Sequence, residues 1–428
     1  MNSTNKIQPH WQLKKLGEVC FTTSGGTPNR GNSKFYQGNI PWVKSGELDR
    51  GLILDTEEKI SEEAIKNSSA KVFPKGTLLI ALYGATIGKL AFLGIDAATN
   101  QAICGIFKNE NIDSNYLYHF LFYKKPNLVK QGIGGAQPNI SQGILKNLDL
   151  PVPPLPEQQA IVARIEELFS ELDNGIAQLK TAQQQLKVYR QSLLKWAFEG
   201  KLTSSITNEK LRITNDGLPE GWKLTKLGDY IENINSGKSY RCDERPPSKD
   251  EVGIIKVSSV TWGFFDEMES KTCFSKDLFN ANYLVKKGDF LFSRANTIEF
   301  IGACVIVNKV DKKLMLSDKI LRFTFSQDVL KEYALYYLRS RKGRKQIEIL
   351  STGNQDSMRN IGQEKIRQIE FPYCSLKDQQ LIVTELESKL TVCDKIEETI
   401  SQSLQQAETL RQSILKKAFE GKLVKLNQ

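Results

Sequence analysis

Histidine is scarce in this sequence, and cysteine occurs without any metal-binding spacing. The 428 residues include two histidines, His10 and His119, and seven cysteines that never form a Cys-x-x-Cys pair. So few histidines exclude most histidine-based catalysis and most zinc sites. An odd, unpatterned cysteine count argues against a disulfide framework or a zinc ribbon. We therefore interpret the cysteines as small buried apolar residues and His119 as a structural residue, and we expect no metal ligands.

Long apolar segments are also absent. The N-terminal residues lack the apolar run of a signal peptide. The longest uncharged apolar stretch, residues 78–88, is too short to span a bilayer, and Lys89 ends it. The length is typical of two to four domains, and 59 basic against 49 acidic residues give a net charge of +10. We expect a soluble, cytoplasmic, multidomain protein whose basic excess favours a polyanionic partner.

The sequence contains a large internal repeat, a feature that decides how the whole fold is read. Residues 139–202 align with residues 360–423 at a constant offset of 221 without a gap, and 24 of the 64 positions are identical. The clearest identities are Gln-Gln-x-Ile-Val at 158 and 379, and Ala-Phe-Glu-Gly-Lys-Leu at 197 and 418. Upstream, Trp-x-Leu-x-Lys-Leu-Gly at residue 11 recurs at residue 222. The chain is therefore organised as variable, constant, variable and constant blocks.

Each constant block predicts a long helix. Its apolar residues follow one another at steps of three and four, as on the face of a helix that pairs with another helix. Prolines between residues 151 and 156 mark the start of the first helix, and Gly200 and Gly421 stand where the helices should stop. We expect about 43 residues in each helix, roughly 65 Å in length, with Gly175 as a point where the first can kink. The predicted helix-pairing residues are Ile161, Ile165, Leu168, Leu172, Leu179, Leu186, Leu193, Ile382, Leu386, Ile396, Ile400, Leu404, Leu410 and Ile414.

The variable blocks predict mixed α/β domains. Short apolar runs at 77–82, 290–293 and 303–307 predict strands, residues 116–123 and 333–338 predict short aromatic helices, and loops follow at 132–143 and 351–362. Residues 1–150 carry 17 basic and 12 acidic residues, a net +5, and residues 216–375 carry 26 and 22, a net +4. The constant blocks are nearly neutral, which suits protein–protein packing. We place the domain boundaries at 1–150, 151–203, 204–375 and 376–428.

Catalytic motifs are missing. An adenine methyltransferase needs an Asn/Asp-Pro-Pro-Tyr/Phe loop, but Val152 and Arg245 precede the two Pro-Pro pairs of this chain. A phosphate-binding loop needs Gly-x4-Gly-Lys-Ser/Thr. Residues 26–31 have the glycine spacing but Asn32 replaces the lysine, and residues 84–89 are one residue short. We therefore expect no catalytic residue and no ATP site.

The arrangement resembles the specificity (S) subunit of type I restriction–modification enzymes over essentially the whole chain. The resemblance is carried by Leu-Pro-Glu-Gln-Gln at 155–159, Leu-Lys-x-Ala-Phe-Glu-Gly-Lys-Leu at 194–202, Trp-Val-Lys-Ser-Gly at 42–46 and Gly-Thr-Leu-Leu at 76–79. The duplicated layout is more specific than these strings. The second copy departs from the first where Lys377 and Asp378 replace Pro-Glu. The resemblance implies α/β (α+β) recognition domains in two copies, separated by two long helices that form an antiparallel coiled coil, with a pseudo-twofold relation between the copies.

The resemblance also implies a function. Such a subunit is not an enzyme: each recognition domain reads one half of a bipartite DNA target, and the coiled coil sets the gap between the halves. Two methyltransferase (M) subunits dock on it, and motor–nuclease (R) subunits join the full enzyme for host defence in the prokaryotic cytoplasm. Any S-adenosylmethionine, ATP and magnesium are bound by those partners, so we expect no cofactor of its own.

Loop residues of the variable blocks are the candidates for DNA contacts, because Arg, Lys, Asn, Gln, Ser and Thr read base edges. The DNA-binding candidates are Thr27, Asn29, Arg30, Lys44, Ser45, Tyr83, Asn100, Gln101, Gln137, Lys238, Tyr240, Arg241, Lys256, Ser258, Arg294, Asn296, Asn354, Gln355 and Arg359. The first choices among them are Arg30, Gln137, Arg241, Arg294, Gln355 and Arg359. The competing interpretation of each is a solvated loop residue or a phosphate contact.

Two other functions stay open on the sequence. One is a pure interaction scaffold for a DNA-modifying complex, with variable blocks that read nothing. The other is an enzyme, such as a nuclease fused to a coiled coil, against which the missing motifs argue.

Overall fold

The computed structural model describes residues 8–131, 139–202, 212–215, 217–261 and 263–424 and divides the chain into two compact units. The first unit is Met1–Leu179 with Ser401–Gln428, and the second is Lys180–Ile400. Each unit therefore combines one variable block with parts of both long helices. Among the described residues, no helix has both the length and the apolar character needed to cross a bilayer.

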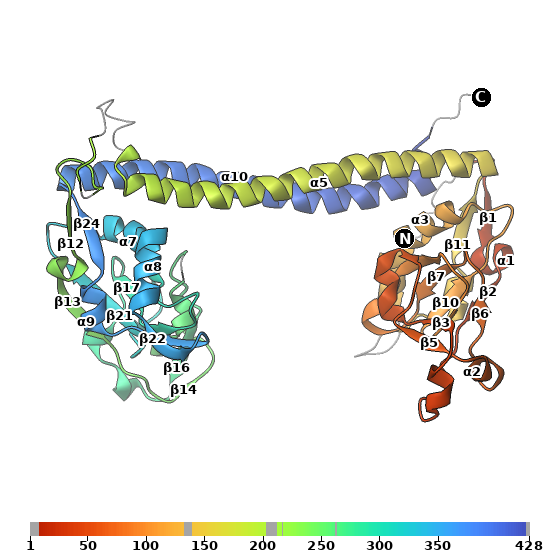
Figure 1. The fold of residues 1–428 in the computed structure, drawn as a ribbon, viewed down its shortest axis with the longest axis horizontal. Coiled ribbons are helices and arrows are strands. Elements are labelled where there is room, and N and C mark those ends of the chain that lie inside the picture. Colours follow the sequence, from red (N-terminus) through yellow and green to blue (C-terminus); the bar gives the residue numbers. More distant parts are fainter. Residues whose placement is uncertain (1–7, 132–138, 203–211, 216, 262, 425–428) are drawn as a thin grey trace. The chain divides into compact units, whose positions relative to one another are not determined.

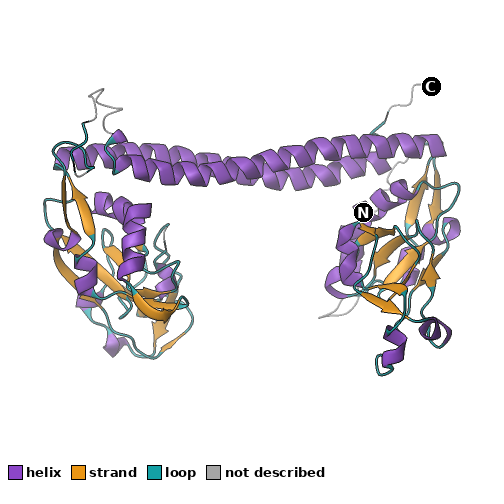
Figure 2. Ribbon diagram, viewed as in Figure 1, coloured by secondary structure: helices purple, strands orange, loops and turns teal. Residues whose placement is uncertain are grey.

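The first unit contains a mixed α/β domain (Figures 1 and 2). One sheet has the order β2-β10-β7-β8-β4, a second has the order β5-β3-β9-β6, and β1 pairs with β11. Its strands are β1 Gln12–Lys15, β2 Thr22–Ser24, β3 Ile40–Val43, β4 Leu52–Ile53, β5 Glu58–Ile60, β6 Val72–Phe73, β7 Leu78–Ala81, β8 Leu90–Leu93, β9 Ala97–Thr99, β10 Ile103–Ile106 and β11 Asp149–Val152. Its short helices are α1 Leu16–Val19, η1 Ser33–Tyr36, η2 Ser45–Arg50, α2 Glu62–Lys66, η3 Gly84–Thr86, α3 Ser114–Gln131 and α4 Gln142–Lys146.

The second unit contains a domain of the same class. One sheet has the order β13-β21-β17-β19, another β14-β16-β15-β20 and a third β18-β23-β22, and β12 pairs with β24. Its strands are β12 Lys223–Lys226, β13 Ile231–Ser236, β14 Cys242–Asp243, β15 Gly253–Ile255, β16 Ser270–Cys273, β17 Phe290–Ser293, β18 Ala295–Asn296, β19 Cys304–Ile306, β20 Leu314–Met315, β21 Ile320–Phe325, β22 Thr352–Gln355, β23 Met358–Asn360 and β24 Glu370–Tyr373. Its short helices are η4 Leu227–Tyr230, η5 Val257–Ser259, η6 Lys276–Leu278, η7 Ala281–Tyr283, α7 Lys331–Arg339, α8 Arg341–Leu350 and α9 Gln363–Arg367.

The predicted short elements are confirmed in part. The three apolar runs form β7, β17 and β19, and the two aromatic segments lie in α3 and α7. The loop predictions were wrong in two places. Residues 351–362 contain the hairpin of β22 and β23, and Ser141 caps α4 by accepting a hydrogen bond from the Ile144 N–H. Serine at this position satisfies an otherwise unpaired N–H of the first helical turn, so a polar loop residue marked a helix start.

The two long helices have the lengths that the sequence predicted. Helix α5 spans Leu155–Ala197, 43 residues, and α10 spans Leu376–Phe419, 44 residues. Both are continuous ribbons in Figure 2, and α5 is helical through Gly175, where a kink had been expected. Gly200 and Gly421 follow the helix ends with φ of +71° and +70°. This left-handed conformation costs least for glycine and closes a helix.

The helices run side by side in opposite directions within each unit (Figure 1). In the first unit, Asp173 of α5 forms an ion pair with Arg411 of α10. In the second unit, Arg190 of α5 lies 2.7 Å from Asp394 and 2.9 Å from Glu397 of α10. Each of these contacts joins the two long helices within its own unit.

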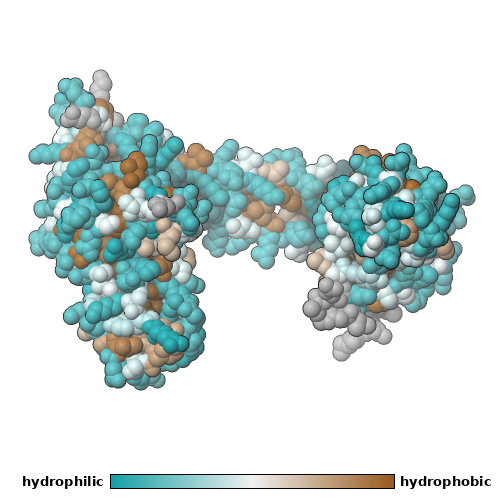
Figure 3. All heavy atoms as spheres, turned by 60° about the horizontal axis from the view of Figure 1, so that its bottom comes forward, coloured by the Kyte–Doolittle hydropathy of each residue, from teal (hydrophilic) through white to brown (hydrophobic). Residues whose placement is uncertain are grey.

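The buried seam of the long helices repeats every seven residues. On α10 the buried side chains are Leu386, Cys393, Ile400, Ala407 and Ile414, and on α5 Ile165, Leu186 and Leu193 are buried while Leu168, Leu172 and Leu179 are half-buried. Ile161 and Ile382 are buried near the helix starts, and Leu404 is half-buried. Ile396 and Leu410 are 45% and 50% exposed, which corrects their predicted place in the seam. The face that a helix buries against a single partner helix is narrow. Apolar residues spaced by three or four can therefore lie at the solvent-exposed margin of that face. On the face drawn in Figure 3, hydrophobic atoms appear in small groups among hydrophilic ones.

Candidate nucleic-acid interface

The helix starts join their domains through a buried glutamine that occurs in both copies. Gln158 accepts a hydrogen bond from the Asp113 N–H at 2.8 Å and donates to the carbonyl oxygens of Asn111 and Pro153 at 3.0 and 2.9 Å. Gln379 accepts from the Leu330 N–H at 2.9 Å and donates to the carbonyl oxygens of Asp328 and Cys374 at 3.0 and 2.9 Å. Both glutamines are fully buried. The sequence marked them as repeat identities, but their role as domain anchors was missed.

The helix ends supply a second duplicated contact. Phe419 of α10 packs against Tyr116, Phe120 and Tyr123 of the first domain. Phe198, directly after α5, packs against Tyr333 and Tyr337 of the second domain. Each domain is therefore held by the start of the helix that follows it and by the end of the other long helix.

In the first domain, three segments that carry predicted DNA-contact residues come together. The side chain of Thr27 hydrogen-bonds Gln101, and the Trp42 indole N–H donates to the Gly26 carbonyl at 3.1 Å. The Asn100 N–H donates to the Val43 carbonyl at 3.0 Å. A Cβ on Gly25 would lie 2.1 Å from the Thr99 hydroxyl, so only glycine allows this approach. The structure thus gathers Thr27, Asn100 and Gln101 at one place.

Arg30 and Lys44 lie beside a pair of glutamates that the sequence reasoning missed. Arg30 donates to Glu58 at 2.6 Å, and its guanidinium lies 4.4 Å from the Tyr36 ring centroid. Lys44 Nζ lies 2.8 Å from Glu57 and 3.1 Å from Glu58. The hydrogen bond from Arg30 lowers the pKa of Glu58, and that from Lys44 lowers the pKa of Glu57. Hydrogen bonds fix the side chains of this cluster, and its two cations are balanced by two carboxylates. A net positive charge therefore does not mark it as a DNA-binding surface.

The remaining candidates of the first domain are less constrained or not described. Asn29 is exposed and accepts from the Gly31 N–H at 2.9 Å, and Ser45 is half-buried at the start of η2. Tyr83 is 38% exposed beside the backbone bridge to Asn139. Gln137 lies outside the described residues, as does the side chain of Asn354 in the second domain.

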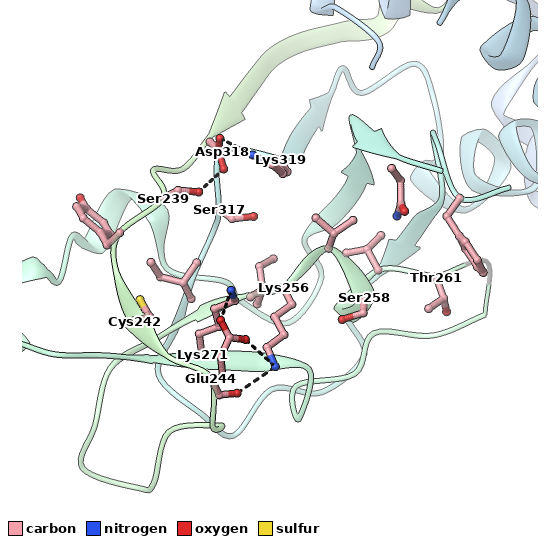
Figure 4. A pocket seen from close by; sticks show the side chains of 17 residues that line it. Ser239, Cys242, Glu244, Lys256, Ser258, Thr261, Lys271, Ser317, Asp318 and Lys319 are labelled. Atoms are coloured by element: carbon pink, nitrogen blue, oxygen red, sulfur yellow. Dashed lines mark hydrogen bonds and ion pairs between the residues drawn. The ribbon is translucent and has the colours of Figure 1, made fainter. Parts of the chain in front are cut away.

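The second domain has a cavity of about 710 Å³ that several candidates line (Figure 4). Tyr240, Lys256, Ser258 and Asn296 are among the lining residues. Tyr240 precedes β14, Lys256 and Ser258 lie at η5, and Asn296 ends β18, so three separate loops meet here. Sequence spacing gave no sign of this convergence, because β14 and β18 belong to different sheets whose packing the spacing does not record.

Ion pairs and hydrogen bonds fix the polar side chains of the cavity. Glu244 lies 2.6 Å from Lys271 and 3.6 Å from Lys256, and the hydrogen bond from Lys271 lowers the pKa of Glu244. Burial disfavours the charged form of Asp318, but hydrogen bonds from Ser239 and Lys319 leave its pKa below the usual value. Three lysines and two carboxylates line the cavity, so these side chains carry a small positive excess.

The arginines of the second domain differ in how much of their hydrogen-bonding capacity is already used. Arg359 donates to the carbonyl oxygens of Ser351 and Gly353, both at 2.9 Å, so much of its hydrogen-bonding capacity is used within the β22–β23 hairpin. Its role as a base reader stays a prediction. Within the described part of the chain, the side chains of Lys238, Arg241 and Arg294 form no hydrogen bond or ion pair. Among the DNA-contact candidates of the second domain, these three cations therefore keep their donors free for an anion.

The other candidates bond to near neighbours. Ser258 hydrogen-bonds Glu269, and Asn296 lies 3.4 Å from the Ser293 hydroxyl and accepts from the Thr297 N–H at 2.9 Å. Gln355 is exposed and accepts from the Ser357 hydroxyl at 3.4 Å. No group of three or more His, Cys, Asp or Glu side chains suited to a metal ion occurs among the residues that the structure covers.

Comparisons with known proteins agree with this architecture. The family model described as the type I restriction modification DNA specificity domain matches residues 9–181 and 219–406. The EcoKI type I restriction enzyme specificity subunit of Escherichia coli K12 is 25% identical, over 98% of this chain and 91% of that one. A solved chain from a study of complex assembly in a type I R-M system superposes with a TM-score of 0.73 at 18% identity, covering 97% of this chain and 99% of that one. The crystal structure of the HsdS subunit from Thermoanaerobacter tengcongensis gives 0.61 at 18% identity, covering 98% and 99%. These two structures share the fold. Because the family model matches most of the chain in two separate segments, this protein belongs to the family of type I restriction modification DNA specificity proteins.

Proposed function

We propose that this chain is the DNA-reading subunit of a type I restriction–modification complex, in which each recognition domain reads one half of a bipartite DNA target. The observation that carries the proposal is the duplicated anchoring of two different variable domains by Gln158 and Gln379. The same helix–domain contacts hold two domains whose sequences have diverged. Such an arrangement is suited to presenting two different DNA-binding surfaces in the same orientation relative to the helices. Half-site spacing in DNA-binding proteins follows from such geometry.

In this proposal the long helices form an antiparallel coiled coil that acts as the spacer. The seven-residue repeat of buried side chains supports it, because that period is typical of supercoiled helices. A pseudo-twofold relation between the copies is supported by the exchanged contacts, in which Phe198 serves the second domain and Phe419 the first. A twofold operation would convert each of these contacts into the other.

The chemistry belongs to partners in this proposal. Two M subunits dock on the duplicated frame and bind S-adenosylmethionine, and R subunits bring ATP and magnesium in the full enzyme. The chain itself contributes DNA recognition and no catalytic group. The nearly neutral constant blocks are suited to protein contacts, whereas the domains carry the basic excess that DNA attracts. The setting is the cytoplasm of a prokaryote.

The decisive experiment exchanges residues 1–150 for the corresponding block of another family member and sequences the methylated motif in cells that also contain the M subunit. We expect one half of the motif to change while the other half and the gap are kept. Inserting about one helical turn into both long helices should alter only the gap. If a block exchange changes both halves or neither, the modular reading is wrong.

A non-reading interaction scaffold remains the second candidate, because Arg30 and Lys44 are paired with glutamates. A gel-shift assay with the M subunit present separates the two functions. A sequence preference supports the reader, whereas equal affinity for all duplexes supports the scaffold.

A further inference from the structure

Two free thiols lie opposite each other on neighbouring strands of the second domain. The register of β14 and β16 sets Cys242 against Cys273, and their Sγ atoms are 3.9 Å apart. The Cys273 N–H donates to the Val252 carbonyl at 2.9 Å, on the side of β16 away from β14. The two cysteines are therefore a non-hydrogen-bonded pair, whose Cα atoms typically lie about 4.5 Å apart. That separation falls within the range of about 4.4–6.8 Å that a disulfide tolerates.

The two thiols differ in access. Cys242 is half-buried and lines the 710 Å³ cavity (Figure 4). Cys273 is 9% exposed. The strand β14 has two residues, lies at the edge of its sheet and pairs with β16 alone in that sheet. It directly follows the loop that carries Lys238 and Arg241. A covalent bond across this pair would tie that loop to the sheet.

We propose that Cys242 and Cys273 are a reversible dithiol site that hydrogen peroxide oxidises to a disulfide. The Cys242 sulfur attacks one peroxide oxygen, the O–O bond breaks, and the products are a sulfenic acid on Cys242 and one water. The Cys273 sulfur then attacks the Cys242 sulfur, the S–O bond breaks, and the oxygen leaves as a second water with the thiol proton. Two thiols lose two hydrogens and two electrons, and the peroxide is reduced to two waters.

The order of attack follows from the geometry. Cys242 is the more accessible of the two thiols because it lines the cavity, so it reacts first with the peroxide. Burial, together with the nearby Cys242 sulfur, raises the pKa of the Cys273 thiol to about 12, so this thiol takes the second, resolving role. Because the thiolate is the nucleophile, disulfide closure should accelerate as the pH rises.

The consequence for DNA rests on the proposed function. Oxidation would restrain the loop before β14 and so alter contacts to the second half-site, without a direct effect on the first domain. The dithiol chemistry is independent of that function.

The chemical test uses the full chain, reduced and then exposed to dilute hydrogen peroxide. After free thiols are blocked with iodoacetamide, we expect one linked peptide pair joining residues 242 and 273, an intact mass lower by two hydrogens before blocking, and reversal by dithiothreitol. Cys242→Ser should abolish the link, and the control Cys20→Ser, at a buried thiol of the other unit, should keep it. A Cys242 that is overoxidised or alkylated without linkage, or linked to another cysteine, overturns the proposal.

The functional test compares the reduced and oxidised chain in complex with the M subunit. We expect a several-fold change in affinity for duplexes altered in the second half-site, and none for those altered in the first, with Cys242→Ser insensitive to peroxide. If the disulfide forms and affinities stay equal, the regulatory consequence is overturned. If the reduced complex has no sequence preference at all, the proposed function fails instead.

Discussion

The guanidinium of Arg190 lies 2.7 Å from the carboxylate of Asp394, and the chain repeats this ion pair 221 residues away as Arg411 with Asp173. Each pair joins the two long helices, and the helix that gives the arginine in one unit gives the aspartate in the other. Within each unit, an arginine–aspartate pair therefore joins the two long helices by the same chemistry.

Removing this ion pair should cost little stability, because Asp394 is 71% exposed and solvent screens the attraction. A double-mutant cycle of Arg190→Ala and Asp394→Ala should give a coupling of roughly 0.3–1 kcal/mol in urea unfolding. The coupling should shrink in high salt. A coupling that is unchanged by salt would contradict an electrostatic origin.

The anchoring glutamines should matter much more. Gln158→Ala leaves the Asp113 N–H and the carbonyl oxygens of Asn111 and Pro153 without their partner at part-buried or buried positions, so we expect a loss of roughly 2–4 kcal/mol in the unfolding free energy of the first unit. The exposed neighbour provides the control, since Gln159→Ala should stay within about 0.5 kcal/mol. Chemical denaturation of both variants checks this. Equal losses of unfolding free energy in the two variants would contradict the anchoring role of Gln158.

The helix seam can be tested by a matched pair of leucines. Leu193 is fully buried and Leu410 is 50% exposed. Leu193→Ala should cost roughly 2–5 kcal/mol through lost burial and the cavity left behind. Leu410→Ala should change the unfolding free energy by less than about 0.5 kcal/mol. A comparable loss of unfolding free energy in Leu410→Ala would show that Leu410 belongs to the buried seam.

Stability should fall in acid because of His119. Burial lowers its pKa from 6.5 to about 4, and its Nδ1 has no hydrogen-bond partner among the described residues. The unfolded state therefore binds the extra proton first. The stabilisation from keeping His119 neutral is complete above about pH 6.5 and is lost as the pH falls towards 4, by up to about 3 kcal/mol. His119→Gln should flatten that slope in urea unfolding between pH 7 and 5, and an unchanged slope would show that another group causes it.

DNA contacts by the second domain should involve Arg294. Its side chain has no partner within the described residues, so a base or phosphate can take it. Under the proposed function, Arg294→Ala should weaken binding of the cognate second half-site by roughly 1–3 kcal/mol and leave the first half-site unaffected. The exposed Lys249→Ala serves as a charge-matched control, and titration of labelled duplexes with the M complex measures both. A uniform loss on all duplexes would indicate a phosphate contact instead.

The long helices could be predicted because their evidence is local and repeated. Prolines before the first helix and glycines after both helices indicated where the helices begin and end. The gapless repeat showed that the helical pattern of apolar residues did not arise by chance. Ile396 and Leu410 were predicted to be buried because a spacing of three and four residues does not reveal which side of an apolar helix face is exposed to solvent. The role of Gln158 depends on backbone groups of Asn111 and Asp113, and the role of Arg359 depends on carbonyl groups within its own hairpin; side-chain spacing records neither. The cavity around Lys256 depends on sheet order, and residue spacing does not encode that order.

The exchanged helix ends have a consequence for how the protein is made. The Gln8 amide donates to the Gly421 carbonyl at 2.8 Å, a contact between residues 413 positions apart, and Phe419 fills the aromatic cluster of the first domain. At about 5–20 residues per second, a ribosome would need roughly 15–60 seconds after Phe120 to synthesise Phe419. The first domain is therefore completed after the second, and a nascent chain cannot close the core of its first domain until Phe419 has been synthesised.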